Sequence, residues 1–200
     1  MRYFIGVDEA GRGPVAGPVA VAAFCIGKEA KYRLAQFFKN GKVRDSKKLT
    51  PESRERIFKQ ILAEKNLGRV SYAVSFASAE VIDRKGISFA IRHALRKSLK
   101  FIGVKATECL VLLDGSLKAP EEFIFQRTII KGDEKEAVIA LASIVAKVSR
   151  DRKMCTLAKK YPQYGFEVHK GYGTAAHYRK LKQHGLSPVH RRSFLKSLGK

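Results

Sequence analysis

Two adjacent carboxylates, Asp8 and Glu9, end a short apolar run that begins at Tyr3, and a Gly-Arg-Gly turn at Gly11–Gly13 follows them. Acidic side chains at the end of a buried strand are costly unless they are paired or bind a cation. The turn can present backbone N–H groups and a guanidinium to an anion. The stretch therefore predicts a divalent-metal site that faces a phosphodiester.

The direct adjacency of Asp8 and Glu9 restricts the geometry of such a site. Successive side chains of a strand point to opposite faces of the sheet. We therefore expect the strand to end near Val7 and Glu9 to belong to the turn, so that both acids can share a metal ion. An Asp-x-Glu spacing, which would place both acids on one strand face, is absent.

Two further acids occupy similar positions, because Asp114 ends the apolar run 109–113 and Asp133 follows the strand candidate 123–130. In open α/β sheets, ligands bind at the carboxyl ends of the strands. Taken singly, an Asp beside a glycine is more often a turn former. Four acids at strand ends favour a joint site for Mg²⁺ or Mn²⁺, which prefer oxygen ligands, and two such ions promote phosphodiester hydrolysis.

A glycine-hinged loop contains His169, Lys170, Tyr172 and Thr174. A tyrosine between two glycines could stack on a sugar or base, or read a 2′-hydroxyl. The alternative is a flexible loop whose tyrosine packs against the protein. Four of the five histidines lie in the last 32 residues. Their spacing matches no zinc motif, so phosphate contacts or local hydrogen bonds are expected.

Lys147 and Asp151 are four residues apart in a predicted helix. Residues at this spacing lie on one helix face, so an internal salt bridge is expected. A contact of Lys147 with a nucleic-acid backbone is the alternative.

Charge and composition restrict the class of protein. The chain has 200 residues, of which 45% are hydrophobic, and it carries 40 basic and 18 acidic residues, a net charge of +22. This length fits one domain with its own core. The charge predicts a polyanionic partner, most commonly nucleic acid, with an unpartnered basic surface as the alternative. We find neither a basic amphipathic helix with an aromatic face nor an apolar run long enough to span a membrane.

The three cysteines are few, odd in number and far apart. They fit neither a disulfide framework nor a zinc knuckle, which suggests a reducing cytoplasm. Cys25 and Cys109 lie in apolar runs and are expected to be buried.

Hydrophobic periodicity and punctuation predict strands that alternate with helices, and hence a mixed sheet flanked by helices. Thr50 is expected to cap the second helix, with Pro51 at its first position. The segment 43–49 is expected to be a polar loop. The expected strands are 3–7, 19–26, 69–76, 109–113 and 123–130, and the expected helices are 31–38, 51–65, 78–84, 87–102, 133–160 and 174–184.

An ordered series of motifs runs through nearly the whole chain and resembles that of the ribonuclease HII family. The motifs are DEAGRGPVAGPV (8–19), DSKKL (45–49), LLDG (112–115), KGDEKEAVIALASIVAKVSRD (131–151), HKGYGT (169–174) and SPVHRRSF (187–194). The resemblance implies an α/β protein of the ribonuclease H-like fold, a mixed five-stranded sheet flanked by helices with a small C-terminal helical segment. It implies one domain over 1–200, with a core at about 1–160 and a substrate-binding segment at about 161–200.

The resemblance also implies a metal-dependent endonuclease. Such an enzyme cleaves the RNA strand of RNA–DNA hybrids and incises 5′ to single ribonucleotides in duplex DNA, leaving a 3′-hydroxyl and a 5′-phosphate. The catalytic, metal-binding acids are expected to be Asp8, Glu9, Asp114 and Asp133. The substrate-binding set is expected to be Gly11, Arg12, Gly13, Lys47, His169, Lys170, Tyr172 and Thr174. The protein is expected to be a cytoplasmic monomer that does not bind membranes. The sequence gives no sign of a protein partner such as a clamp.

Two alternatives belong to other classes. Another two-metal nuclease on the same fold, such as a junction resolvase, would not need the GRG turn and Tyr172. A non-catalytic nucleic-acid-binding protein would leave four acids in a cationic groove without a purpose.

Overall fold

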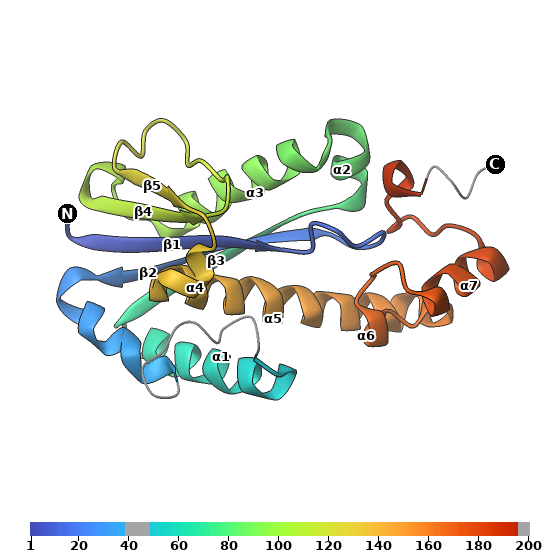
Figure 1. Ribbon diagram of the computed structural model, residues 1–200, viewed down its shortest axis with the longest axis horizontal. Helices are drawn as coiled ribbons and strands as arrows, with labels where there is room; N and C mark the ends of the chain where they lie inside the picture. The colour runs from blue at the N-terminus through green and yellow to red at the C-terminus, as the bar shows by residue number, and fades with distance from the viewer. Residues whose placement is uncertain (39–48, 196–200) are drawn as a thin grey trace.

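One five-stranded sheet with strand order β3-β2-β1-β4-β5 forms the centre of the molecule (Figure 1). A computed structural model describes residues 1–38 and 49–195. β1, β2 and β3 pair in antiparallel fashion, whereas β4 is parallel to β1 and β5 to β4, which confirms the mixed sheet expected from the sequence. The strands are β1 (Tyr3–Ala10), β2 (Val19–Gly27), β3 (Val70–Ala77), β4 (Cys109–Asp114) and β5 (Gln126–Ile129).

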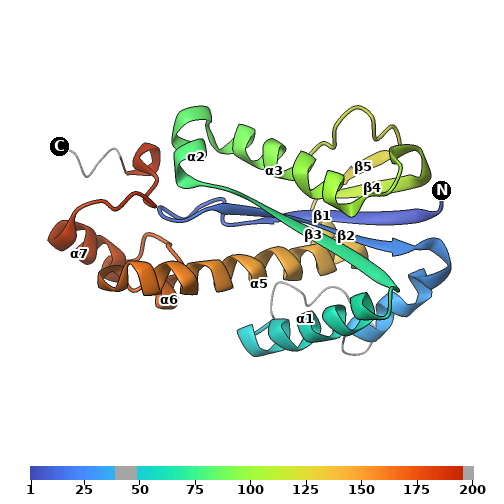
Figure 2. The same ribbon diagram turned by 180° about the vertical axis from the view of Figure 1, so that it is seen from behind.

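Helices cover both faces of the sheet, with α2 and α3 on one face and α1 and α5 on the other (Figures 1 and 2). The α-helices are α1 (Pro51–Asn66), α2 (Ala79–Lys85), α3 (Ile87–Ile102), α4 (Gly132–Lys135), α5 (Ala137–Lys160), α6 (Phe166–His169) and α7 (Ala175–His184). The 3₁₀ helices are η1 (Lys28–Phe37), η4 (Ala106–Glu108), η5 (Pro162–Tyr164) and η6 (Arg192–Phe194).

Alternation along β1 divides the core into two layers. Ile5 and Val7 pack into the cluster beneath α3. Gly6 points the other way, and a Cβ atom there would lie 2.1 Å from the backbone carbonyl of Val138 on α5. Gly6 therefore allows α5 to pack close to β1. The next side chain on this face is that of Asp8, which brings an acid to the junction of β1 and α5.

Several sequence predictions are confirmed. The hydroxyl of Thr50 accepts a hydrogen bond from Ser53 N, with Pro51 in the first turn of α1. The apolar side chains of α3 are buried at the predicted helical spacing. Cys25 and Cys109 are buried. Most of the loop expected at 43–49 lies outside the described residues.

The expectation that β1 ends at Val7 is wrong, because the strand continues to Ala10. Pairing with β2 keeps it extended, since Glu9 lies opposite Val21. Pairing with β4 stops earlier, at Val7 opposite Leu113. Beyond Val7, therefore, β1 pairs with β2 but no longer with β4 among the described strands. This leaves room beside Asp8 and Glu9 on the β4 side.

The single helix expected from Asp133 to Lys160 is also wrong. A short α4 closes with a hydrogen bond from Glu136 N to Gly132 O, and Glu136 itself is extended, with φ −121° and ψ 118°. α5 then begins at Ala137. The intervening sequence contains neither Gly nor Pro, so packing of α5 against the sheet, rather than local propensity, determines the break.

The C-terminal segment packs on the far half of α5, beyond the end of the sheet (Figure 1). A separate hydrophobic cluster joins it to α5 and to the loop after β1. That cluster contains Val15, Ala16, Met154, Ala158, Tyr164, Phe166, Leu181 and Leu195. Among the described residues, no helix has the length and apolar character needed to cross a membrane.

Candidate active site

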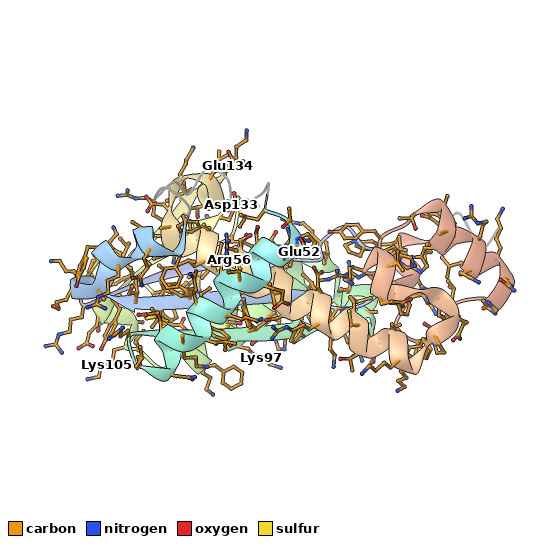
Figure 3. All side chains as sticks on the ribbon, turned by 90° about the horizontal axis from the view of Figure 1, so that it is seen from below. Glu52, Arg56, Lys97, Lys105, Asp133 and Glu134 are labelled. Atoms are coloured by element: carbon orange, nitrogen blue, oxygen red, sulfur yellow. The ribbon has the colours of Figure 1, made fainter. Side chains whose placement is uncertain are left out.

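The four predicted acids line one cavity of about 290 Å³. Asp8 comes from the α5-facing side of β1, and Asp114 is the last residue of β4. Asp133 lies in α4 and is almost completely buried. Viewed from below, Asp133 lies at the opposite edge of the molecule from Lys97 and Lys105 (Figure 3). The cavity lining is completed by Arg54, Ser143, Ile144 and Lys147.

Backbone groups hold two of these carboxylates in place. Oδ1 of Asp8 accepts a 2.7 Å hydrogen bond from Glu9 N. Oδ1 of Asp114 accepts a 2.6 Å hydrogen bond from Gly132 N, which ties the end of β4 to the start of α4. Asp8 also has a side-chain hydrogen bond with Ser143 of α5.

Burial and mutual repulsion disfavour the charged forms of two of these acids. Burial, followed by the charge of Glu9, raises the pKa of Asp8 to about 8. Burial also raises the pKa of Glu9, although Arg12, at 3.0 Å from its carboxylate, opposes the shift. Such a cavity favours a bound cation, and carboxylate oxygens are the ligands that Mg²⁺ and Mn²⁺ prefer.

The carboxylates do not form a closed metal cage as placed. Within residues 1–38 and 49–195, no three His, Cys, Asp or Glu side chains form a group that could together hold one ion. Like charges that share a cavity repel one another. Ion binding at this cavity would therefore draw the carboxylates closer together.

A second cavity, of about 270 Å³, lies next to the first. The Gly11–Gly13 turn and Tyr172 line it together, although they are far apart in the sequence. Glu9, Ser143 and Lys147 line both cavities. Tyr172 is 45% exposed, and its ring centre lies 5.9 Å from the guanidinium carbon of Arg150. The predicted sugar-sensing turn and tyrosine thus lie beside the predicted metal site.

Two buried arginines hold the loop that follows β1. Arg150 donates from Nε to Pro18 O, at 3.0 Å, and from Nη2 to Ala16 O, at 3.3 Å. Arg191 binds three further carbonyl groups of the loop. Its donors reach Gly17 O at 2.9 Å, Arg12 O at 3.0 Å and Gly11 O at 2.7 Å.

Burial lowers the pKa of Arg191 to about 9, and the charge of Arg150 contributes. Arg150 and Arg191 bind mainly backbone carbonyls of the loop after β1. The shape of this loop therefore depends on the two arginines.

Gly11 is required by the same packing. Its φ of +91° is a conformation that L side chains rarely adopt. A Cβ atom there would lie 1.9 Å from Nε of Arg150. The glycine therefore allows the arginine to lie directly beneath the turn.

Three predicted substrate-binding residues line neither cavity. Nε2 of His169 lies 2.8 Å from Tyr164 O, and Thr174 caps α7. Nζ of Lys170 contacts the carbonyl of Glu167 and lies 3.5 Å from Sγ of Cys155. Their contact with substrate stays a prediction. Lys47 lies outside the described residues.

Sequence reasoning missed Arg54, Ser143, Arg150 and Arg191 as parts of the site. It also expected Lys147 to pair with Asp151, but the described residues form no ion pair between them. Asp151 instead opposes the lowering of the pKa of Lys147 that burial causes. A signal was present, because Ser143, Lys147 and Arg150 interrupt an apolar helix at i, i+4 and i+7 spacing.

The fold and site together define a nuclease of the ribonuclease H-like class. The mixed sheet carries acids at the ends of β1 and β4, and the chain has a net charge of +22 suited to a polyanionic substrate. Residues 5–197 match the family model described as Ribonuclease HII, and the chain belongs to this family. It is therefore a metal-dependent endoribonuclease that hydrolyses the RNA strand of RNA–DNA hybrids.

Individual relatives agree with this assignment. A ribonuclease HII of Caldicellulosiruptor bescii is 44% identical over 197 residues, which is 98% of this chain and 88% of the relative. The crystal structure of ribonuclease H2 from Pyrococcus horikoshii OT3 superposes with a TM-score of 0.73 at 26% identity, covering 98% and 96% of the two chains. The structure of the PCNA:RNase HII complex from Archaeoglobus fulgidus superposes with a TM-score of 0.70 at 26% identity, covering 96% of this chain and 94% of that chain.

Proposed function

We propose that the two adjoining cavities have separate tasks in one reaction. Asp8, Glu9, Asp114 and Asp133 hold two divalent ions, Mg²⁺ or Mn²⁺, at the scissile phosphodiester. The Gly11–Gly13 turn and Tyr172 bind the ribose whose 2′-hydroxyl marks the cleavage site. The enzyme then cuts 5′ to that ribonucleotide, in hybrids and at single ribonucleotides in duplex DNA.

The observation that carries this proposal is the shared wall of the two cavities. Glu9 lines both, and Arg12 in the turn is paired with Glu9 at 3.0 Å. A nucleotide with its sugar against Tyr172 would therefore have its phosphate near the acids. Discrimination of the sugar and hydrolysis of the adjoining bond are thereby linked by a single placement of substrate.

The residues of the chain divide the chemical work. The four acids would hold divalent ions, which when bound would supply an activated water and stabilisation of the leaving oxygen. Lys147, which lines both cavities, is placed to contact the phosphate backbone, and Arg12 adds a guanidinium at the turn. The ring of Tyr172 offers a stacking surface beside the ribose. The basic surface supplies affinity that does not depend on sequence.

The remaining expectations belong to the same proposal. The C-terminal substrate-binding segment comprises residues at about 161–200 and the core those at about 1–160, and a hydrophobic cluster that includes Phe166 and Leu181 packs the segment onto α5 and the loop after β1. The enzyme acts as a cytoplasmic monomer. Its substrates are RNA–DNA hybrids and DNA duplexes that contain ribonucleotides.

A DNA duplex with one ribonucleotide tests the proposal directly. The purified protein is incubated with this duplex or an all-DNA control, with Mg²⁺ or with a chelator. We expect a single metal-dependent nick 5′ to the ribonucleotide and none in the control. Cleavage of both duplexes would remove the sugar-sensing role from Tyr172 and the turn. Binding without cleavage, with any divalent ion, would contradict the catalytic role of the four acids.

Tyr172→Ala tests the proposed contact of Tyr172 with the ribose separately from the metal site. We expect nicking at the single ribonucleotide to slow by about 10-fold or more, since base or sugar stacking on an aromatic ring is worth about 1–3 kcal/mol. Tyr32→Ala is the matched control, because Tyr32 is 74% exposed and lines neither cavity. An unchanged rate in Tyr172→Ala would return its loop to a purely structural role.

A further inference from the structure

A chain of hydrogen bonds runs through two buried histidines from Ser187 to Tyr172. Ser187 N donates to Nδ1 of His190 at 2.9 Å. Nε2 of His190 lies 3.0 Å from Nε2 of His177, and Nδ1 of His177 lies 2.9 Å from Tyr172 O. His177 and His190 are almost completely buried. The chain ends on the backbone of the tyrosine that lines the second cavity.

The two backbone ends determine where each proton lies. Ser187 N–H can only donate, so Nδ1 of His190 is an acceptor and its proton is on Nε2. That Nε2–H donates to Nε2 of His177, which must be unprotonated. The proton of His177 is therefore on Nδ1 and is donated to Tyr172 O. Both rings are neutral, and each has one defined tautomer.

His169 binds the backbone of the residue that precedes the same tyrosine. Its Nδ1 accepts from Gly171 N at 3.2 Å, and its Nε2 donates to Tyr164 O at 2.8 Å. The rings of His169 and His177 stack with their centres 4.2 Å apart. One imidazole of this stack thus binds the carbonyl of Tyr172, and the other binds the N–H of Gly171, one residue earlier.

The surroundings keep the rings neutral. Tyr164 from η5 and Phe166 from α6 pack against His190, with ring centres at 4.7 and 5.6 Å. Burial, and then His177, lowers the pKa of His190 to about 4, and burial lowers the pKa of His177. The ionisable groups that face the pair are His169 and Tyr164, with Arg191 next to His190 in the chain. A second proton would place two N–H groups face to face.

We infer that His177 and His190 are positioning residues that fix Tyr172 in the ribose-binding cavity, an inference that rests on the proposed role of Tyr172. They act on its backbone carbonyl and do not touch the substrate. Arg191, the neighbour of His190, binds the carbonyls of Gly11 and Arg12. One short segment thereby sets both walls of the cavity, Tyr172 through His190 and the glycine turn through Arg191.

Histidine spectra test the hydrogen-bond chain without any substrate. In nitrogen-15 spectra of the wild-type protein, we expect the Nδ1–H tautomer for His177 and the Nε2–H tautomer for His190. His190 should stay neutral from about pH 8 to about pH 5, and His177 should protonate only below pH 6.5, where an ordinary histidine protonates. An Nε2–H tautomer for His177, or protonation of either ring near pH 6.5, would overturn the inference.

Two variants of His177 separate its two hydrogen bonds. In His177→Asn, the side-chain amide lies near the Nδ1 position and can still donate to Tyr172 O. In His177→Gln, the amide reaches the Nε2 position instead, so the bond to His190 is kept and the bond to Tyr172 is lost. Tyr172 O keeps a bond from Thr174 N at 2.9 Å, so the loop retains one constraint in both variants.

We expect His177→Gln to lower kcat at a single ribonucleotide by about 3- to 10-fold, the value of one net hydrogen bond. KM should change little, because phosphate contacts dominate affinity. His177→Asn should stay near the wild-type rate. His184→Gln, an exposed position on the same helix, is the control. Equal losses in the Asn and Gln variants, or a change in KM alone, would contradict a positioning role.

A double-mutant cycle with Tyr172→Ala shows whether the effect passes through the tyrosine ring. Once the ring is absent, His177→Gln should have no further effect on kcat. Fully multiplicative losses would overturn the inference, even if both single variants are impaired. If Tyr172→Ala alone leaves cleavage unchanged, the proposed function fails at that residue, while the tautomers still report on the hydrogen-bond chain separately.

Discussion

Nη2 of Arg191 donates a 2.7 Å hydrogen bond to the carbonyl oxygen of Gly11, which lies 180 residues earlier in the chain. The acids that this turn follows come from the N-terminal strand, yet the shape of the turn depends on a residue near the C-terminus. The cavity lined by this turn and Tyr172 is therefore assembled from distant parts of the sequence. Its geometry can be perturbed without any change to the four acids.

Arg191→Lys tests this dependence. A lysine has one ammonium group in place of the guanidinium fork, so at least one of the three loop carbonyls loses its partner. Leaving buried carbonyls unsatisfied should lower the free energy of unfolding by about 2–4 kcal/mol, measured by urea denaturation. Arg192→Lys, at an exposed position, serves as control. Equal stability of both variants would show that the carbonyl contacts of Arg191 are dispensable.

The two glycines of the turn should respond differently to alanine. Gly11→Ala places a Cβ atom against Arg150 at a φ of +91° and should destabilise by more than about 2 kcal/mol. Gly13→Ala meets nothing within 4 Å and should leave stability within about 1 kcal/mol. Thermal unfolding of both proteins checks this contrast. Similar melting temperatures would mean that the turn can move away from Arg150.

Asp114→Asn should abolish cleavage while leaving substrate binding largely intact. The amide oxygen can still accept from Gly132 N, so the fold is retained, but the charge that attracts the metal is lost. Removing a residue that only supports a metal ligand typically lowers activity by about 10- to 100-fold, and we expect the loss of the ligand Asp114 itself to be larger. Nicking assays give the rate, and fluorescence anisotropy with a labelled hybrid gives the affinity.

The control for this variant is Glu121→Gln, an exposed acid in the loop after β4. Mg²⁺ should raise the melting temperature of the wild type and of this control by mass action, and should raise that of Asp114→Asn less. Normal turnover by Asp114→Asn would remove Asp114 from the metal site.

Acid should weaken the C-terminal segment through its histidines. The pKa of His190 is about 4 in the folded protein, below the ordinary value of 6.5, so the unfolded chain binds a proton first as pH falls. The stability linked to this group is complete above about pH 6.5 and is lost progressively toward about pH 4. Urea denaturation of the wild type at several pH values in this window measures the slope.

His190→Gln removes one of the groups responsible for that slope. Its free energy of unfolding should depend less steeply on pH over the same window, whatever its absolute stability. His93→Gln, on the exposed face of α3, should keep the wild-type slope. Identical slopes in all three proteins would show that His190 is not held neutral by the fold.

The sequence predicted those parts of the site that obey local rules. An apolar run that stops at a carboxylate located Asp8 and Asp114, and helical spacing located the buried face of α3. The adjacency of Asp8 and Glu9 led to a wrong strand end, because the longer pairing with β2 could not be read from β1 alone. The break at Glu136 was missed for a similar reason, since no residue there disfavours a helix.

The buried polar groups were beyond such rules. Arginine is expected at the surface, so no pattern indicated that Arg150 and Arg191 bind loop carbonyls in the interior. The sequence did suggest local hydrogen bonds for the C-terminal histidines. It could not identify their partners, because His177 and His190 meet through a hydrogen bond between two separate segments.

The position of Arg191 also has a consequence for the order in which the enzyme is made. Synthesis proceeds from the N-terminus, and domains generally begin to fold as they emerge from the ribosome. The acids and most of the sheet are complete long before Arg191 is added. A nascent chain can therefore hold its carboxylates before it can shape the Gly11–Gly13 turn, so the ribose selectivity that we propose for this turn would be acquired only after Arg191 has left the ribosome.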